Sequence, residues 1–350
     1  MAHNTFGGTF SITTFGESPG PALGVIVDGV ESGFAVDLDA IQEEMNRRRP
    51  GANPSGTERN EIDKLVILSG LYEGVTTGTP IAMFLESTNQ RSKDYSHLAN
   101  VFRPGHADWT FYKKYGIRDI RGGGRSSGRE TSARVAAGAL AKQLLAKRGI
   151  TIQAGVVQVG DIIAHERNWK KCDPILSCPD QDAASAMVRL IETVRSENDS
   201  VGGVIECIAR GVPVGLGEPV FGKLDAHLAH AILSIGAVKG IQFGSGFALA
   251  SMRGSQANDQ RTKNGFVTNH AGGVLGGISS GQDILFQAAI KPTSSIGVEQ
   301  QTVTKDGEDA KLIVTGRHDP CICARAVVVV EAMTAITLLD LYYTAFGKHA

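Results

Sequence analysis

The sequence has little net charge and few cysteines. Its 35 Lys and Arg residues balance 36 Asp and Glu residues, which leaves a formal charge of -1 at pH 7. This balance disfavours a protein that binds nucleic acid or anionic lipid, because such proteins carry an excess of basic charge. The five cysteines are an odd number and include no C-x-x-C pair, so neither a disulfide framework nor a zinc site is indicated.

The sequence also has no recognisable secretory signal or membrane span. Residues 1–9 lack a basic start followed by an apolar stretch. The longest apolar run, residues 326–339, contains Glu331 and follows Arg325, which predicts a buried helix instead of a transmembrane one. Together with the cysteine usage, these absences lead us to expect a cytoplasmic protein.

Glycine is plentiful, with 43 residues in 350, and it falls in clusters. Clustered glycines indicate loops whose backbone approaches something closely. The content of 42% hydrophobic and 20% charged residues is ordinary for a globular protein. Because we find no repeat and no low-complexity linker, we predict one large α/β (α+β) domain over residues 1–350.

Periodicity and capping residues predict the main elements. The expected strands lie at 8–15, 22–28, 64–71, 80–86, 150–164 and 203–210. The expected helices follow Asp37 as an N-cap and span 129–148, 183–198, 223–235 and 320–343. For the last of these, Asp319 is the predicted N-cap and Pro320 the first helical residue.

A glycine-rich turn at 122–130 is the sharpest local signal for chemistry. It runs into a predicted helix with Ser127 and Glu130 as a capping box. Free backbone N–H groups, hydroxyls and two arginines at such a helix start suit a phosphate. The turn matches neither the P-loop nor the dinucleotide fingerprint. The alternative is a turn that only begins a helix.

Residues 16–20 match the G-x-S-x-G pattern of a serine nucleophile, with Ser18 at its centre. A serine hydrolase is therefore a second hypothesis. Its nucleophile needs a strand, a turn and then a helix, whereas Pro21 and a second strand-like segment follow here. The sequence context disfavours this hypothesis.

Three further loops combine basic residues with hydrogen-bond donors. They are residues 103–108, with His106; 291–295, with Lys291 and three hydroxyls; and 317–319. Each has a structural explanation, such as a surface histidine, a turn after a strand or a helix cap. Together they suit a site for two multiply anionic small molecules. Cys321 and Cys323 are predicted to pack in a helix.

Nine segments resemble the chorismate synthase family, in the family's order and over nearly the whole chain. They are GESPG at 16–20, NRRRPG at 46–51, QRSKDY at 90–95, RPGHAD at 103–108, GGGRSSGRET at 122–131, GLGEPVF at 215–221, NHAGGVLGGISSGQDI at 269–284, KPTSSI at 291–296 and RHDPC at 317–321.

The resemblance implies a single-domain β-α-β sandwich, assembled as a homotetramer. It implies the last step of the shikimate pathway, in which 5-enolpyruvylshikimate 3-phosphate loses phosphate and a ring hydrogen by anti-1,4-elimination. The implied cofactor is reduced FMN, with NADPH as a candidate reductant. No nucleic-acid or membrane partner is implied.

The resemblance also implies roles for individual residues. His106 would give a proton to the reduced flavin, and Asp319 would relay the proton taken from the substrate. Ser18 and Ser127 complete the implied catalytic residues. Substrate phosphate and carboxylates would be held by Arg48, Arg103 and Arg129. The implied FMN contacts are Arg125, Ser126, Ser127, Gly236, Ala237, Gly276, Lys291, Pro292, Thr293, Ser294, Ser295 and Arg317.

Two positions depart from the family pattern. Pro19 stands where the family has a histidine, the expected proton donor to the leaving phosphate. Pro54 stands where the family usually has a basic residue, which puts in doubt one anion contact and any NADPH role of that position. We expect FMN binding to persist and turnover to be reduced, or to depend on Ser18 or nearby Lys and Arg groups. The alternative is an FMN- and anion-binding relative with impaired activity.

Overall fold

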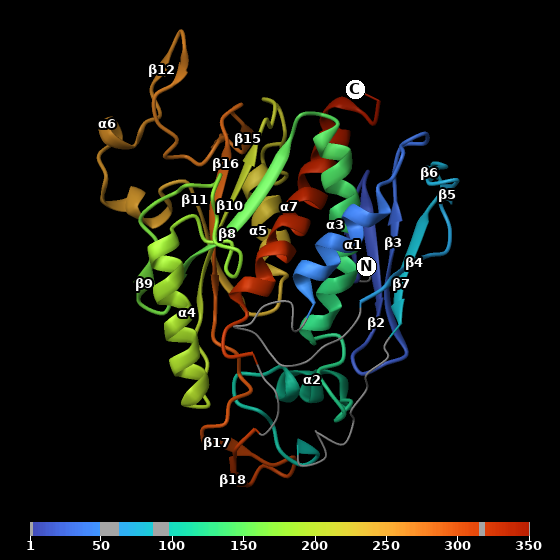
Figure 1. Ribbon diagram of the computed structural model, residues 1–350, viewed down its shortest axis with the longest axis vertical. Coiled ribbons are helices and arrows are strands. Elements are labelled where there is room, and N and C mark those ends of the chain that lie inside the picture. The colour runs from blue at the N-terminus through green and yellow to red at the C-terminus, as the bar shows by residue number, and fades with distance from the viewer. Residues whose placement is uncertain (1–2, 50–62, 87–97, 315–318, 350) are drawn as a thin grey trace.

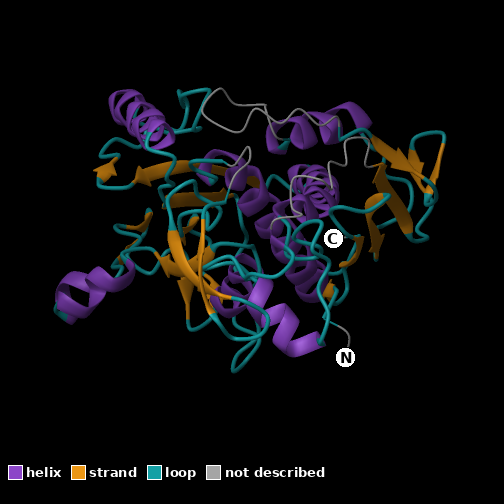
Figure 2. Ribbon diagram, turned by 90° about the horizontal axis from the view of Figure 1, so that it is seen from below, coloured by secondary structure: helices purple, strands orange, loops and turns teal. Residues whose placement is uncertain are grey.

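A layer of helices lies between two antiparallel sheets in the computed structural model of the chain, which describes residues 3–49, 63–86, 98–314 and 319–349 (Figures 1 and 2). The first sheet has the strand order β1 (Thr5–Gly7), β2 (Ser11–Gly16), β3 (Ala22–Asp28), β7 (Ile81–Glu86), β4 (Leu65–Ile67). The second has the order β11 (Val238–Phe243), β16 (Ile284–Ile290), β10 (Gly203–Arg210), β8 (Thr151–Val159), β9 (Ile162–Ile163). The predicted β-α-β sandwich is confirmed.

The helical layer consists of α1 (Leu38–Arg48), α3 (Thr131–Ala146) and α7 (Cys323–Phe346). Helix α3 packs on β2 and β3 of the first sheet, and α7 packs on β8 and β10 of the second. Helix α5 (Leu224–Leu233) lies against α7 and β11, while α4 (Gln181–Ser196) packs on β8 and β9. Helix α2 (Asp108–Tyr115) lies at one end of the layer, below it in Figure 1.

Shorter elements complete the described part of the chain. Four two-stranded hairpins are β5 (Leu71–Tyr72) with β6 (Val75–Thr76), β12 (Arg261–Thr262) with β13 (Gly265–Phe266), β14 (Val274–Leu275) with β15 (Ile278–Ser279), and β17 (Gln300–Val303) with β18 (Asp309–Leu312). The short helices are η2 (Gly128–Glu130), η3 (Gly246–Ser251) and α6 (Gly254–Ala257).

Apolar periodicity explains the layers. In β7, Ile81, Met83 and Leu85 alternate with more exposed residues, so one face of the first sheet is buried against the helices. Helix α7 is buried on almost every side. By length and composition it passes for a membrane span, yet most of it lies inside the fold, which confirms the predicted buried helix. Helices α3 and α7 approach closely at Gly138, where an added Cβ would lie 2.3 Å from the Cβ of Ala332.

The structure confirms several predicted elements and changes others. The strand expected at 64–71 is only β4, Leu65–Ile67, and the one expected at 8–15 is β2, which begins at Ser11. Strands β3 and β10 have the predicted bounds, and Asp37 caps α1 by accepting the Ala40 N–H at 2.9 Å. The strand expected at 150–164 is a hairpin instead, because the chain turns at Gly160, which has a φ of +57°. The predicted cap Asp319 is also wrong. Helix α7 begins at Cys323 after Ile322, and the Asp319 carboxylate accepts a hydrogen bond from Arg325.

Candidate functional site

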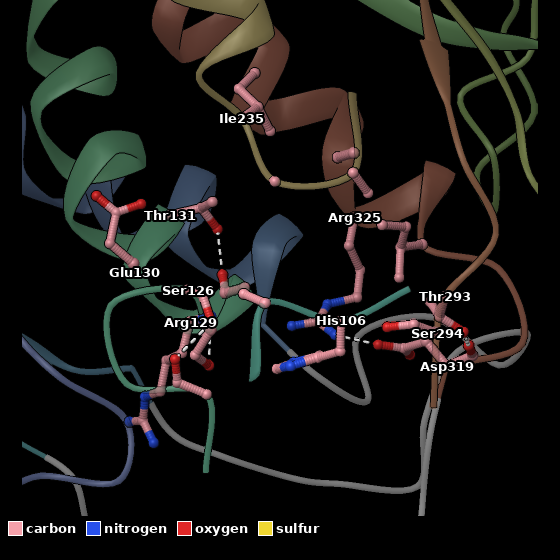
Figure 3. Close-up of a pocket in the computed structure, with 18 of the residues that line it drawn as sticks. His106, Ser126, Arg129, Glu130, Thr131, Ile235, Thr293, Ser294, Asp319 and Arg325 are labelled. Carbon is pink, nitrogen blue, oxygen red and sulfur yellow. Dashed lines mark hydrogen bonds and ion pairs between the residues drawn. The ribbon is translucent and has the colours of Figure 1, made fainter. Parts of the chain in front are cut away.

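A cavity of about 560 Å³ lies where the helical layer meets the loops below it (Figure 3). This volume is within the usual range for small-molecule sites. Eight basic residues line it: Arg48, Arg103, Arg125, Arg129, Arg134, Lys239, Lys291 and Arg325. Among the described lining residues only Glu130 and Asp319 are acidic. The cavity is therefore built to receive negative charge.

Most of the predicted site residues meet in this cavity although they are distant in the sequence. Those that line it are Ser18, Arg48, Arg103, His106, Arg125, Ser126, Ser127, Arg129, Gly236, Ala237, Lys291, Pro292, Thr293, Ser294, Ser295 and Asp319. Gly276 does not line it and instead forms the turn between β14 and β15. Arg317, Pro54 and the segment 90–95 lie outside the described residues.

The glycine-rich turn differs from the phosphate cradle predicted for it. The N–H groups of Gly124, Ser126 and Ser127 donate to the carbonyls of Ser18, Gly123 and Gly124, at 2.9, 3.0 and 3.2 Å. The Ser126 hydroxyl also donates to the Gly123 carbonyl, at 2.6 Å. These donors are used within the turn and its contact with Ser18. These N–H groups are therefore not available to an anion, and the charged side chains that line the cavity are the alternative donors.

The capping box predicted at this turn is half present. The Ser127 hydroxyl accepts the Arg129 N–H at 3.3 Å. The Glu130 side chain does not accept the Ser127 N–H, which donates to the Gly124 carbonyl at 3.2 Å instead. Its carboxylate accepts from the Thr14 hydroxyl at 3.1 Å and from Nε of Arg134 at 2.9 Å. Glu130 thus ties the first sheet to the start of α3.

Three arginines meet at the end of α1. Arg48 is only 1% exposed, and its guanidinium donates to the carboxylate of Asp63. Nη2 of Arg129 lies 3.3 Å from the same carboxylate. Nε of Arg325 donates to the Arg48 carbonyl at 3.1 Å, and its Nη1 donates to Asp319. Three guanidinium groups therefore share two carboxylates among the described residues.

The pKa of Arg48 reflects the positive charges that lie close to it. Burial lowers it, Asp63 opposes that change, and the like charges of Arg325 and Arg129 lower it further, so the net shift is downward. A bound anion would relieve the repulsion between the three cations. This corner of the cavity therefore has the charge that would favour an anion.

A second cluster surrounds Asp108, the first residue of α2. Its carboxylate accepts from Nε and Nη2 of Arg103 at 2.7 and 2.9 Å, and Nη1 of Arg118 lies 3.2 Å away. Nδ1 of His106 lies 2.9 Å from Oδ1 of Asp108. Burial would raise the pKa of Asp108, but Arg103 and His106 outweigh it and hold the pKa well below its usual range.

The opposite wall of the cavity comes from the second sheet and the loop after it. Lys291 donates from Nζ to the Gly105 carbonyl at 2.8 Å, and burial together with the nearby Lys239 lowers its pKa. The Thr293 hydroxyl donates to the Asp319 carbonyl at 3.0 Å. A Cβ added to Gly236 would meet no atom within 4 Å, and Ala237 has a φ of +73°. This wall leaves room for a ligand to approach the backbone.

Sequence reasoning missed Arg134, Lys239 and Arg325 as lining residues. Arg134 and Arg325 belong to helices predicted only as core elements. The Glu130–Arg134 spacing of four was a usable signal, since such pairs face each other on a helix. Nη1 of Arg134 donates to the Ser234 hydroxyl at 2.7 Å, so this side chain links α3 to the segment before Gly236. The contacts of Asp63 with Arg48 and Arg129 join distant segments and have no local signal.

Pro19 lies behind the cavity wall. It is absent from the lining residues, whereas Ser18 is present. A Cβ on Gly122 would lie 2.4 Å from Cδ of Pro19, so the proline packs directly on the glycine-rich turn. Ser18 lies between β2 and β3, which pair with each other. This is a strand–turn–strand unit, so the nucleophile turn of a serine hydrolase is not formed.

The fold and the cavity define a class: a mixed α/β, single-domain enzyme with a cationic small-molecule site. The family model for chorismate synthase matches residues 10–343, and the chain belongs to this family. Its members are lyases that remove phosphate from 5-enolpyruvylshikimate 3-phosphate in the shikimate pathway to the aromatic amino acids. The chain is also similar to a crystal structure of chorismate synthase, with 29% identity, a TM-score of 0.74, and coverage of 97% of this chain and 93% of that chain.

Proposed function

We propose that this chain makes chorismate by anti-1,4-elimination and uses reduced FMN to do so. In this reaction a ring C–H bond and the C–O bond to phosphate break. The ring double bond shifts, and two conjugated double bonds result with no net oxidation. The observation that carries the proposal is the cavity in which eight basic residues face two carboxylates. A substrate with one phosphate and two carboxylates complements this excess of positive charge.

Arg48 and Arg129, with Arg103 on the other side of the cavity, are the proposed substrate-binding residues. The guanidinium of Arg48 is fixed by Asp63 and by the Gly128 carbonyl at 3.4 Å before any ligand arrives. Fixed charges of this kind stabilise the negative charge that develops on phosphate as it leaves, and they need no reorganisation at that moment. The arginines would therefore contribute to rate as well as to binding.

The second wall fits a flavin. A Cβ added at Gly236 would meet nothing within 4 Å, so flat atoms can approach the backbone there, and the same holds for Gly128 across the cavity. Lys291 and the hydroxyls of residues 293–295, with Arg125 and Ser126 across the cavity, are the proposed FMN contacts. When bound, reduced FMN supplies electron density to the substrate as phosphate departs. Gly276 and Arg317 stay in the proposal through the family resemblance alone.

Two residues are proposed to handle protons. His106 lines the cavity with Nδ1 against Asp108, which leaves Nε2 as the nitrogen that can exchange a proton with a ligand. Asp319 also lines the cavity and is held in place by Arg325. Figure 3 shows both on the side opposite Ser126 and Arg129, in keeping with separate proton-handling and anion-binding regions. Ser127 and Ser18 add hydroxyls near the anion region.

We also propose a cytoplasmic homotetramer. Large apolar side chains are exposed away from the cavity, including Phe221 at 95%, Phe247 at 84% and Val220 at 73%. Exposed apolar surface of this kind supports association between copies. Light scattering coupled to size-exclusion chromatography tests the stoichiometry. NADPH oxidation by the chain with FMN present tests NADPH as the reductant.

The direct test is anaerobic phosphate release from 5-enolpyruvylshikimate 3-phosphate with dithionite-reduced FMN. We expect phosphate and chorismate in equal amounts. Tight FMN binding without phosphate release would instead support the alternative, a flavin- and anion-binding relative with impaired activity. Loss of FMN binding as well would contradict both.

The alternative rests on Pro19, and the Pro19→His variant tests it. A general acid typically contributes about 10²–10⁴-fold to a rate. If a proton donor is missing at position 19, the variant should gain turnover within that range in single-turnover phosphate release. Pro21→His is the matched control because Pro21 is exposed and two residues away. Equal rates for the wild-type chain and Pro19→His would show that this chain does not need an imidazole there.

A further inference from the structure

A row of hydrogen-bonded side chains runs beside the cavity from the first sheet to α5. The Thr14 hydroxyl of β2 donates to Oε1 of Glu130 at 3.1 Å. Nε of Arg134 donates to Oε2 of that carboxylate at 2.9 Å, and Nη1 of Arg134 donates to the Ser234 hydroxyl at 2.7 Å. The Ser234 hydroxyl then donates to the Ala231 carbonyl of α5 at 2.5 Å. Arg134 therefore connects the start of α3 with the end of α5.

The turn at 234–237 joins α5 to β11, and all of its residues line the cavity. Its second residue, Ile235, packs in the core beside the cavity (Figure 3). Gly236 leaves open space around an added Cβ, and Ala237 has a φ of +73°. Backbone in such a conformation persists only where the surrounding structure holds it. The Ala237 carbonyl accepts the Lys291 N–H at 2.9 Å, which holds the end of the turn, and the contact with α3 holds its start.

The guanidinium of Arg134 suits this role because Glu130 fixes its direction. The two residues are four apart on the chain, and their side chains are only 17% and 8% exposed. The planar fork of an arginine can donate to the carboxylate with Nε and to the Ser234 hydroxyl with Nη1 at the same time. A lysine ammonium is a point charge and cannot keep both contacts in this geometry. The turn is thus held in place before a ligand arrives.

We propose that Arg134 is a positioning residue: through Ser234 it holds the Gly236–Ala237 backbone in the place where the flavin binds. The effect on FMN rests on the proposed function, whereas the effect on the turn rests on the hydrogen bonds alone. A wall that is already ordered loses less conformational entropy when a rigid ligand binds, and it therefore binds that ligand more tightly. Loosening the turn should weaken FMN binding, and saturating FMN should restore turnover.

Two variants of the full chain test the bond between Arg134 and Ser234. Arg134→Lys keeps the charge and loses the fork, and Ser234→Ala removes the acceptor from an exposed position. We expect each variant to raise the Kd for oxidised FMN about 10-fold, the order of effect of losing one hydrogen bond to a charged group. Quenching of FMN fluorescence measures this Kd. With saturating reduced FMN, kcat should equal the wild-type value.

Ser196→Ala is the matched control. Ser196 ends α4, and its hydroxyl donates to the Thr193 carbonyl at 2.7 Å, the same local bond that Ser234 makes at the end of α5. Ser196 does not line the cavity, so its variant should bind FMN like the wild type. Unchanged Kd values in Ser234→Ala and Arg134→Lys, or an equal change in the control, would overturn the proposal. If Arg134→Lys does not fold, Ser234→Ala decides.

The double variant shows whether the arginine acts through the serine. Arg134→Lys/Ser234→Ala should bind FMN no more weakly than Arg134→Lys alone, because the bond is already lost in the single variant. Multiplying losses would overturn the proposal.

Hydrogen exchange measures the effect on the turn without FMN. The Val238 N–H donates to the Ile235 carbonyl at 3.2 Å across the turn, so its exchange rate reports local opening. We expect faster exchange in segment 234–238 of both single variants and unchanged exchange in β10. Unchanged exchange at the turn would overturn the proposal. A wild-type chain that does not bind FMN would contradict the proposed function instead, and the exchange rates would still decide whether Arg134 holds the turn.

Discussion

Arg47 and Arg48 are neighbours on α1, and they enter two clusters of opposite design. Arg47 and Lys142 face Glu44 and Glu331 between α1, α3 and α7, with contacts of 2.7 to 2.9 Å. This set, which we call the core cluster, has equal numbers of positive and negative groups. Arg48, Arg129 and Arg325 face Asp63 and Asp319 in the cavity, and this pocket cluster has one positive charge in excess among the described residues.

The pKa shifts of the two neighbouring arginines have opposite signs. Burial would lower the pKa of Arg47, but Glu331 and Glu44 outweigh it and raise the pKa. The pKa of Arg48 is lowered because burial and two nearby arginines outweigh Asp63. The comparison teaches that the fold satisfies charge where it needs rigidity. In the pocket cluster, like charges that lie close together lower the pKa of the buried arginine.

The largest expected effect comes from breaking the core cluster with Glu331→Gln. Glu331 is 2% exposed and also accepts the Ala154 N–H of β8 at 2.9 Å. Removing one partner of a buried ion pair typically costs about 3–5 kcal/mol. Urea denaturation should show that loss. Glu299→Gln, in the exposed pair with Lys311, is the control and should stay within about 0.5 kcal/mol. Equal midpoints for the two variants would refute the structural role of the core cluster.

Two single substitutions at neighbouring positions test whether the two clusters have different roles. Arg48→Met should lower kcat/KM by about 10²–10³-fold, because a fixed charge that faces developing negative charge is lost. It should also lower stability, because Arg48 is one partner of a buried ion pair with Asp63. Arg47→Met, one residue earlier, should leave kcat/KM almost unchanged, because Arg47 does not line the cavity. Steady-state kinetics and urea midpoints of both variants test this. The same changes in kcat/KM and in stability for both variants would show that the two clusters do not have different roles.

The smallest expected effect is on the way the free energy of unfolding depends on pH in the acid range. Burial would raise the pKa of Glu331, but Lys142 and Arg47 outweigh it and lower the pKa in the folded state. Its contribution is therefore complete above the ordinary glutamate pKa of about 4.3 and is lost as pH falls through the lowered folded value. Urea midpoints followed from pH 7 down to about pH 2 should fall less steeply in Glu331→Gln once the pH is below the ordinary glutamate pKa. Parallel slopes would contradict the shift.

The sequence was sufficient for elements with local causes. The bounds of β3 and β10 follow from short apolar runs between turn residues, and the start of α1 follows from its Asp37 cap. The start of α7 could not be predicted, because Asp319 bonds to Arg325 instead of the helix start. The glycine-rich turn was located correctly, but its N–H groups bond within the turn and to Ser18, a contact that depends on the tertiary fold.

The cavity could be predicted only in part, because many of its contacts join segments that are distant in the sequence. The sequence showed which loops carry several hydrogen-bond donors, and the family resemblance indicated that these loops form one site. The residues that hold those donors in place, such as Asp63 and Glu130, act through contacts between segments. Arg325 directly precedes the longest apolar run of the sequence and proved to be a cavity residue. Pattern alone cannot tell which face of a buried helix meets a cavity.

Helix α7 supplies Arg325, Ala326 and Val329 to the cavity from its N-terminal end, next to Ile322 just before the helix, while the rest of the helix forms the centre of the sandwich. One side of the cavity is therefore formed by the same helix that is buried at the centre of the sandwich. Amide protons of Ala326 to Val330 should exchange with solvent only when the whole molecule unfolds, at a rate set by global stability. Motions that admit or release ligands must then come from the loops facing this helix.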